Sequence, residues 1–91
     1  MRTFSRTSQF RKDVKRAEKR GKDLAKLKAV LDLLIEGKPL PPQLRDHPLR
    51  GNFAGGRDCH IEPDWILIYT LAESNTHVRF ERTGTHSDLF R

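Results

Sequence analysis

The spacing of apolar residues changes part-way along this chain, and that change limits the possible folds more than any other feature. Between residues 9 and 36 the apolar side chains recur every three or four positions, as on one face of a helix. Between residues 57 and 84 they follow the two-residue period of β-strands. Helices that precede a run of strands favour an α+β fold, with the helices on one face of a mainly antiparallel sheet.

The helical part predicts two helices. The first covers residues 9–20 and begins after Thr7 or Ser8, whose side chains can cap free backbone N–H groups. Its narrow apolar face holds Phe10, Val14 and Ala17. The second helix follows a cap at Asp23 and ends before Gly37. Its apolar residues are Leu24, Leu27, Leu31, Leu34 and Ile35. Because the connection is short, we expect the two helices to form an antiparallel hairpin.

The other segments predict strands around one long loop. The expected strands are residues 2–7, 57–62, 65–71 and 77–84. Residues 65–71 are apolar at nearly every position, which indicates a central strand that is covered on both faces. The loop at 38–56 is rich in Pro and Gly, and loops of this length in a compact domain usually carry function. With a final helical turn near residues 87–90, the order is β-α-α-β-β-β in a single domain of residues 1–91.

Basic charge is concentrated in the first part of the chain. Residues 1–38 contain 12 Lys and Arg against 5 Asp and Glu, whereas residues 39–91 contain 6 against 7. Most of the polar face of the first helix is basic. A basic surface is typical of proteins that bind a polyanion or an acidic protein, although it also serves solubility alone.

Three absences in the sequence predict a cytoplasmic protein without membrane contact. No apolar run reaches the roughly 18 residues that a transmembrane helix needs. The first residues lack the apolar core of a secretory signal. Cys59 is the only cysteine and cannot form an internal disulfide, so we expect it to be a small core residue.

All four histidines lie in the second part of the chain, and a small basic domain with several histidines suggests RNA cleavage. RNA supplies its own nucleophile, the 2′-hydroxyl. The protein then needs a base, an acid and positive charge on the phosphate. Histidine suits the first two roles and arginine the third. The candidates are His47, His60, Asp64, Arg82 and His86.

The strand order brings most of these candidates together. Asp64 begins the central strand, and Arg82 and His86 end the neighbouring antiparallel strand, so they should meet at one end of the sheet. His60, just before the same turn, belongs to that group, whereas His47 joins it only if its loop folds over. No pair of cysteines or histidines has a recurrent metal-ligand spacing, so we expect neither a metal nor another cofactor.

Two blocks of sequence closely resemble the YafQ-type toxins of the RelE/ParE superfamily. They are "RDHPLRGNFAGGRDCHIEPDWILIY" and "RFERTGTHSDLF", and the similarity extends upstream through "KDVKRAEKRGKDLAKLKAVLDLLIEGKPLP". Only the first eight or so residues match poorly. The resemblance implies two N-terminal helices against a curved antiparallel sheet. It also implies a ribosome-dependent, metal-independent endoribonuclease that cuts mRNA and is neutralised by a cognate acidic antitoxin.

The resemblance also implies roles for individual residues. The catalytic set would be His47, His60, Asp64, Arg82 and His86. Trp65 and Phe90 would contact RNA, and the basic face of the first helix would meet ribosomal RNA through Lys12, Lys15, Arg16 and Lys19. Trp65 and Phe90 are also apolar enough to be core residues. Two other functions remain open: a non-catalytic toxin of the same fold that binds a protein such as DNA gyrase, and a general RNA-binding domain.

Overall fold

The computed structural model describes residues 1–51 and 55–90. Its elements are β1 (Thr3–Arg6), α1 (Ser8–Lys19), α2 (Leu24–Glu36), the 3₁₀ turn η1 (Pro42–Leu44), β2 (His47–Pro48), β3 (Gly56–Glu62), β4 (Trp65–Ala72), β5 (His77–Gly84) and α3 (His86–Leu89). The five strands form one sheet in the order β1-β5-β4-β3-β2. β1 runs parallel to β5 and the other neighbours are antiparallel. The predicted α+β class and the order of the elements are confirmed.

Both long helices begin and end where the sequence indicates. The side chain of Thr7 accepts a hydrogen bond from the backbone N of Phe10 at 2.9 Å, so Thr7 rather than Ser8 caps α1. Asp23 caps α2 by accepting from the backbone N of Ala25 at 3.0 Å. α2 ends at Gly37, which has a φ of 75°, a conformation that costs glycine little because it lacks a Cβ.

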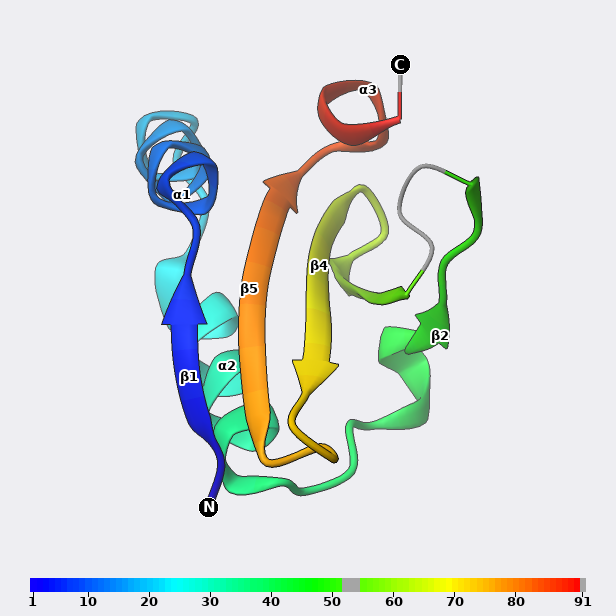
Figure 1. Ribbon diagram of the computed structural model, residues 1–91. Coiled ribbons are helices and arrows are strands. Elements are labelled where there is room, and N and C mark those ends of the chain that lie inside the picture. Colours follow the sequence, from blue (N-terminus) through cyan, green and yellow to red (C-terminus); the bar gives the residue numbers. More distant parts are fainter. Residues whose placement is uncertain (52–54, 91) are drawn as a thin grey trace.

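The two helices pack on the same face of the sheet. In Figure 1, α1 is seen nearly end-on beside β1 and β5, while α2 runs behind the sheet, so they meet the strands in different directions. Their buried residues form one core with the strands, and this core includes Phe10, Leu27, Val30, Tyr69 and Phe80. Cys59 also lies in this core, as predicted, and its burial raises the pKa of the thiol to about 12.

The opposite face of the sheet carries a smaller apolar cluster. It consists of Ile66 and Ile68 from β4, Leu89 from α3 and the partly buried Leu49. β4 is therefore covered on both sides, as its sequence predicted. The C-terminal turn α3 lies over the end of this face (Figure 1). None of the helices in the described part of the chain is long and apolar enough to cross a bilayer.

Candidate active site

Three histidines and a phenylalanine from separate elements form a row of rings. The ring centroids of His47 on β2 and His60 on β3 are 6.2 Å apart, and those of His60 and His86 on α3 are 5.7 Å apart. Phe90 continues the row at 6.2 Å from His86. We call these four residues the ring row. The predicted loop does fold over, because its short strand β2 pairs with β3 and places His47 opposite Asp58.

Asp64 fixes the position of His86. One oxygen of its carboxylate, Oδ1, accepts hydrogen bonds from the backbone N of His86 at 2.9 Å and from Nδ1 of its ring at 2.6 Å. These bonds hold the pKa of Asp64 below its ordinary value, the backbone bond contributing most. Because a carboxylate only accepts, Nδ1 carries the hydrogen and Nε2 is the nitrogen left for proton transfer. Both side chains are more than half exposed, so substrate can reach them.

His47 lies beside a second carboxyl group, that of Asp58, which was not predicted. Its Nδ1 donates to the backbone oxygen of Arg45 at 2.7 Å, and its Nε2 lies 3.0 Å from Oδ1 of Asp58. Since the Arg45 oxygen can only accept, Nδ1 carries a hydrogen. Oδ1 of Asp58 is buried and has no hydrogen-bond partner among the described residues, and burial raises the pKa of this carboxyl group.

His60 and His86 share the wall of an open pocket of about 420 Å³. The pocket is also lined by Arg45 of the preceding loop and by Glu62 and Pro63 at the β3–β4 turn. Within the described residues, Nδ1 of His60 is buried without a hydrogen-bond partner. Oδ1 of Asp58 is in the same condition, and both atoms are unusual because buried polar atoms nearly always have a partner.

Arg82 lies apart from the ring row. A β-bulge between β4 and β5 leaves Glu81 unpaired beside it, and its guanidinium is bound to the buried Asp13 of α1 through Nε at 2.7 Å and Nη2 at 3.3 Å. Arg82 pairs with Ile68 and Ile68 with Asp58, so two strand spacings separate Arg82 from Asp58, about 10 Å. The expected grouping at one sheet end therefore holds for His60, Asp64 and His86, while Arg82 points its charge at α1.

Trp65 is a core residue. It is only 1% exposed, belongs to the core under the helices, and donates from Nε1 to the hydroxyl of Thr83 at 3.0 Å. The expectation that Trp65 contacts RNA is therefore wrong for this structure. Phe90, by contrast, is 43% exposed and lies at the end of the ring row, where a substrate could meet it.

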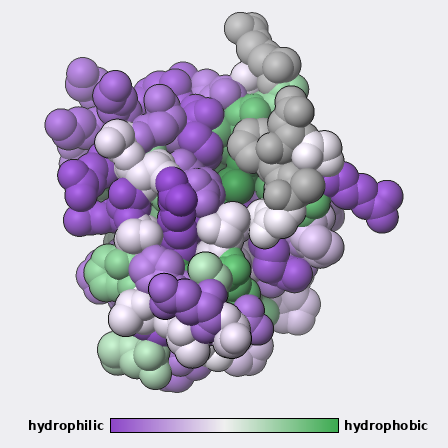
Figure 2. Space-filling model, in the orientation of Figure 1, coloured by the Kyte–Doolittle hydropathy of each residue, from purple (hydrophilic) through white to green (hydrophobic). Residues whose placement is uncertain are grey.

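The basic face of α1 divides into free and bound side chains. Lys12, Lys15 and Lys19 are exposed, and the surface over α1 in Figure 2 is hydrophilic. Arg16, which was expected to belong to the same RNA-binding set, donates to Asp13 at 3.0 Å and is partly buried. Arg16 therefore also contributes to the attachment of α1.

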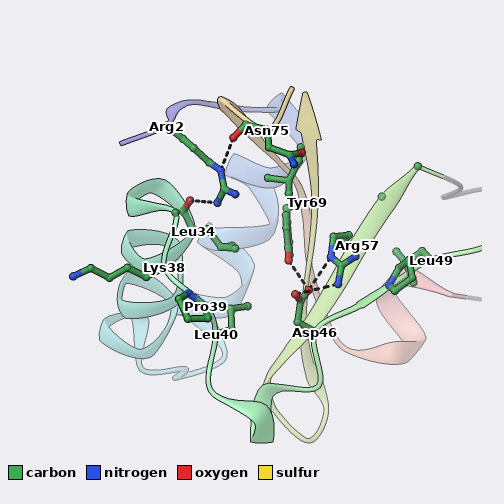
Figure 3. Close-up of a pocket in the computed structure, with 15 residues that line it drawn as sticks. Arg2, Leu34, Lys38, Pro39, Leu40, Asp46, Leu49, Arg57, Tyr69 and Asn75 are labelled. Atoms are coloured by element: carbon green, nitrogen blue, oxygen red, sulfur yellow. Dashed lines mark hydrogen bonds and ion pairs between the residues drawn. The ribbon is translucent and has the colours of Figure 1, made fainter. Parts of the chain in front are cut away.

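A second cavity, of about 650 Å³, is lined by none of the four residues of the ring row, although Asp46 and Pro48 in its wall flank His47. Figure 3 shows Asp46 pointing between Tyr69 and Arg57, and Arg2 reaching across to Leu34. Asp46 accepts from both of its neighbours, the hydroxyl of Tyr69 and the guanidinium of Arg57. None of the predicted catalytic residues lines this cavity.

Two residues of the site were not predicted. Asp58 could have been found, because it is two positions before His60 and alternation puts both on one face of a strand. Arg45 carries no sequence signal, since its place beside the pocket depends on the fold of the loop. Across the described residues, 1–51 and 55–90, no three His, Cys, Asp or Glu side chains are grouped as a metal site.

Comparisons with known proteins all point to one family. Residues 2–91 match the family model described as "Bacterial toxin of type II toxin-antitoxin system, YafQ". The chain is 55% identical over 85 residues to the mRNA interferase toxin YafQ of Escherichia coli K12, covering 92% of this chain and 90% of that protein.

Two solved structures extend the comparison. A chain of the E. coli DinJ–YafQ toxin–antitoxin complex has a TM-score of 0.90 and 53% identity, over 99% of this chain and 98% of that one. A metal-bound toxin from Helicobacter pylori has a TM-score of 0.90 and 38% identity, over 99% and 100% of the two chains. From its sequence and its fold, the chain belongs to the YafQ family of bacterial type II toxin–antitoxin toxins.

Proposed function

We propose that this toxin is a ribosome-dependent endoribonuclease that cuts mRNA by general acid–base catalysis in the cytoplasm. The observation that carries the proposal is the ring row beside an open pocket, with one imidazole hydrogen-bonded to Asp64 and another 3.0 Å from a carboxylate oxygen of Asp58. A protein that only binds a target has no evident need for three stacked imidazoles with two carboxyl partners. The name of the E. coli relative, mRNA interferase, supports the same class of reaction.

The reaction needs two proton transfers and no external nucleophile. A base takes the proton of the RNA 2′-hydroxyl, whose oxygen attacks the adjacent phosphorus. The bond from phosphorus to the 5′-oxygen then breaks, and an acid protonates that oxygen. The products are a 2′,3′-cyclic phosphate and a 5′-hydroxyl. We assign these transfers to Nε2 of His86 and to His47, whose Nε2 lies 3.0 Å from Oδ1 of Asp58, and His60 lies between the two rings.

Positive charge and stacking complete the proposed site. Arg45 lines the pocket and can meet a phosphate directly. Arg82, the cation predicted for this role, is paired with Asp13, and only its Nη1 lies outside that pair. Phe90 closes the end of the row, where a base can stack on its ring.

The decisive experiment maps the cuts and identifies their ends. We expect primer extension to find cuts at defined codons only when ribosomes translate the message, because the ribosome presents the mRNA. The new ends should be a 2′,3′-cyclic phosphate and a 5′-hydroxyl, since the 2′-hydroxyl is the nucleophile. A 5′-phosphate would instead indicate activated water, as in metal-dependent nucleases. Intact mRNA in cells arrested by the toxin would favour a non-catalytic toxin that binds a protein such as gyrase.

Replacing the exposed lysines of α1 tests the proposed contact with ribosomal RNA. We expect Lys12, Lys15 and Lys19 changed together to Gln to weaken ribosome binding and to reduce the salt dependence of log affinity by about two to three units, because fewer counterions are released. A matched control changes the exposed lysines of α2 and the following loop, Lys26, Lys28 and Lys38. Equal loss in both triple variants would show that only net charge matters. Pelleting with ribosomes over a range of salt concentrations measures both effects.

We also propose that an acidic antitoxin segment occupies the second cavity. The related E. coli toxin was solved in complex with its antitoxin DinJ. Here the cavity combines apolar walls from Leu34, Leu40 and Leu71 with the cations Arg2 and Lys38, which suits a segment with both apolar and acidic side chains (Figure 3). The wall of this cavity includes Asp46 and Pro48 on either side of His47, so a segment bound there would also lie next to the ring row.

A further inference from the structure

The C-terminal turn that carries His86 is too short to hold its own position. α3 has four residues, and isolated helices shorter than about 12 residues are marginal in water. Leu89 attaches one side of the turn to the apolar cluster with Ile66 and Ile68. The orientation of His86 must therefore come from other contacts of α3.

Asp88 makes the largest number of these contacts. It forms a capping box with Thr85: its Oδ2 accepts from the backbone N of Thr85 at 2.9 Å, and its own backbone N donates to the Thr85 hydroxyl at 3.1 Å. The same carboxylate accepts from Nη1 and Nη2 of Arg20 at 2.7 and 3.3 Å, and Nη2 of Arg16 lies 3.7 Å away. Asp88 thus joins the C-terminal end of α1 to α3.

Arg20 and Thr85 keep the carboxyl group of Asp88 ionised, and Gly84 packs closely against it. The hydrogen bond from Arg20, followed by that from the backbone of Thr85, holds the pKa of Asp88 well below its usual range. On its other side the carboxylate packs on Gly84. A Cβ at Gly84 would lie 2.8 Å from Oδ2 of Asp88 and 3.0 Å from its Cβ. The backbone of Gly84 does not have a positive φ, so contact with Asp88 is the reason that this position needs glycine.

We propose that Asp88 is a positioning residue that, through Arg20, locks α3 to α1 and so sets where His86 and Phe90 meet the substrate. His86 begins the turn and Phe90 directly follows it, so a rotation of α3 displaces both rings of the row together. The hydrogen bonds that His86 donates to Asp64 would break with the same movement. The effect on the rate rests on the proposed function, whereas the effect on the position of α3 does not.

Two variants test the lock through cleavage. Arg20→Gln removes the tie to α1 and leaves the capping box of α3 intact, and Gly84→Ala displaces Asp88 without changing any charge. Both should slow single-turnover cleavage on programmed ribosomes by about 10- to 100-fold, the cost of a misplacement near 1 Å. Binding to ribosomes should change little. The control Asp32→Asn removes the carboxylate of the exposed Lys28–Asp32 pair, at 2.8 Å, and should leave the rate unchanged.

Titration of Asp64 by carboxyl NMR in Asp88→Asn separates positioning from simple electrostatics. The negative charge of Asp88 raises the pKa of Asp64, whereas the bonds from His86 lower it. Removing only the charge would therefore lower the pKa of Asp64 further, but releasing α3 breaks the His86 bonds and should raise it. The charge-neutral Gly84→Ala should also raise it.

The outcomes are distinct. A raised Asp64 pKa with slower cleavage supports the lock, and full cleavage rates in Arg20→Gln and Gly84→Ala overturn it. A lowered Asp64 pKa in Asp88→Asn also overturns it, because Asp88 then acts through its charge.

If the parent protein does not cleave mRNA, the proposed function fails, yet the titration still decides whether Asp88 positions α3. Thermal unfolding of each variant shows whether the fold is retained, and Arg20→Gln serves if Asp88→Asn does not fold.

Discussion

If His86 transfers a proton as proposed, changing it to Ala should lower the single-turnover rate of mRNA cleavage on programmed ribosomes by about 10²–10⁴-fold, the usual contribution of a general acid or base. We expect His60→Ala to have a loss in the same range, since its ring lies 5.7 Å from His86 in the same row. Neither ring belongs to the apolar cores. The dissociation constant for ribosomes should therefore change little, and the loss should appear in the rate of the chemical step.

His77 provides a matched control for these variants. It is partly buried, and its ring nitrogens contact the hydroxyls of Thr3 at 2.6 Å and Ser5 at 2.9 Å, between β1 and β5 and away from the ring row. His77→Ala should retain cleavage even if it lowers stability. Full activity in both His60 and His86 variants would place the active site elsewhere. A loss of folding in both would make them structural residues and end the proposed mechanism.

The sequence predicted the parts of the fold that depend on local pattern. The periods of three to four and of two located the helices and strands, and the caps at Thr7 and Asp23 located the helix starts. It did not predict β2, because a two-residue strand has no period of its own and exists only by pairing with β3. That pairing is what carries His47 into the site, so its position required the structure.

The sequence predicted which site residues meet where their positions follow from the strand order. It did not predict positions that depend on the partner of a side chain. Asp64 and His86 meet because a turn and the end of an adjacent strand share one edge of the sheet. Arg82 has a place at that edge too, but the buried Asp13 attracts its guanidinium toward α1. In the sequence, Asp13 is one of several charged residues of a basic helix. Nothing there indicates that it is buried or that Arg82 is its partner.

The second large effect that we expect is a loss of stability when Trp65, but not Phe90, is replaced by Ala. Both are aromatic residues of the two sequence blocks that resemble YafQ-type toxins, yet Trp65 is 1% exposed and Phe90 is 43% exposed. Trp65→Ala should lower the free energy of unfolding by about 3–5 kcal/mol, because it removes a large buried ring and leaves a cavity. The hydroxyl of Thr83 would also lose its indole donor, although it still donates to the backbone oxygen of Ile66 at 2.8 Å.

Phe90→Ala should instead leave the free energy of unfolding nearly unchanged and weaken the positioning of mRNA, by about 1–3 kcal/mol if a base stacks on the ring. Urea unfolding of both variants, together with cleavage at saturating ribosome concentration, measures the two effects separately. Trp65→Phe is the control, since it keeps a ring in the core and loses the hydrogen bond to Thr83. If Trp65→Ala were as stable as the parent but unable to bind mRNA, the indole would have to leave the core to act, and its assignment as a structural residue would be wrong. If Phe90→Ala unfolded as readily as Trp65→Ala, the end of the ring row would be part of the core and not a surface for a base.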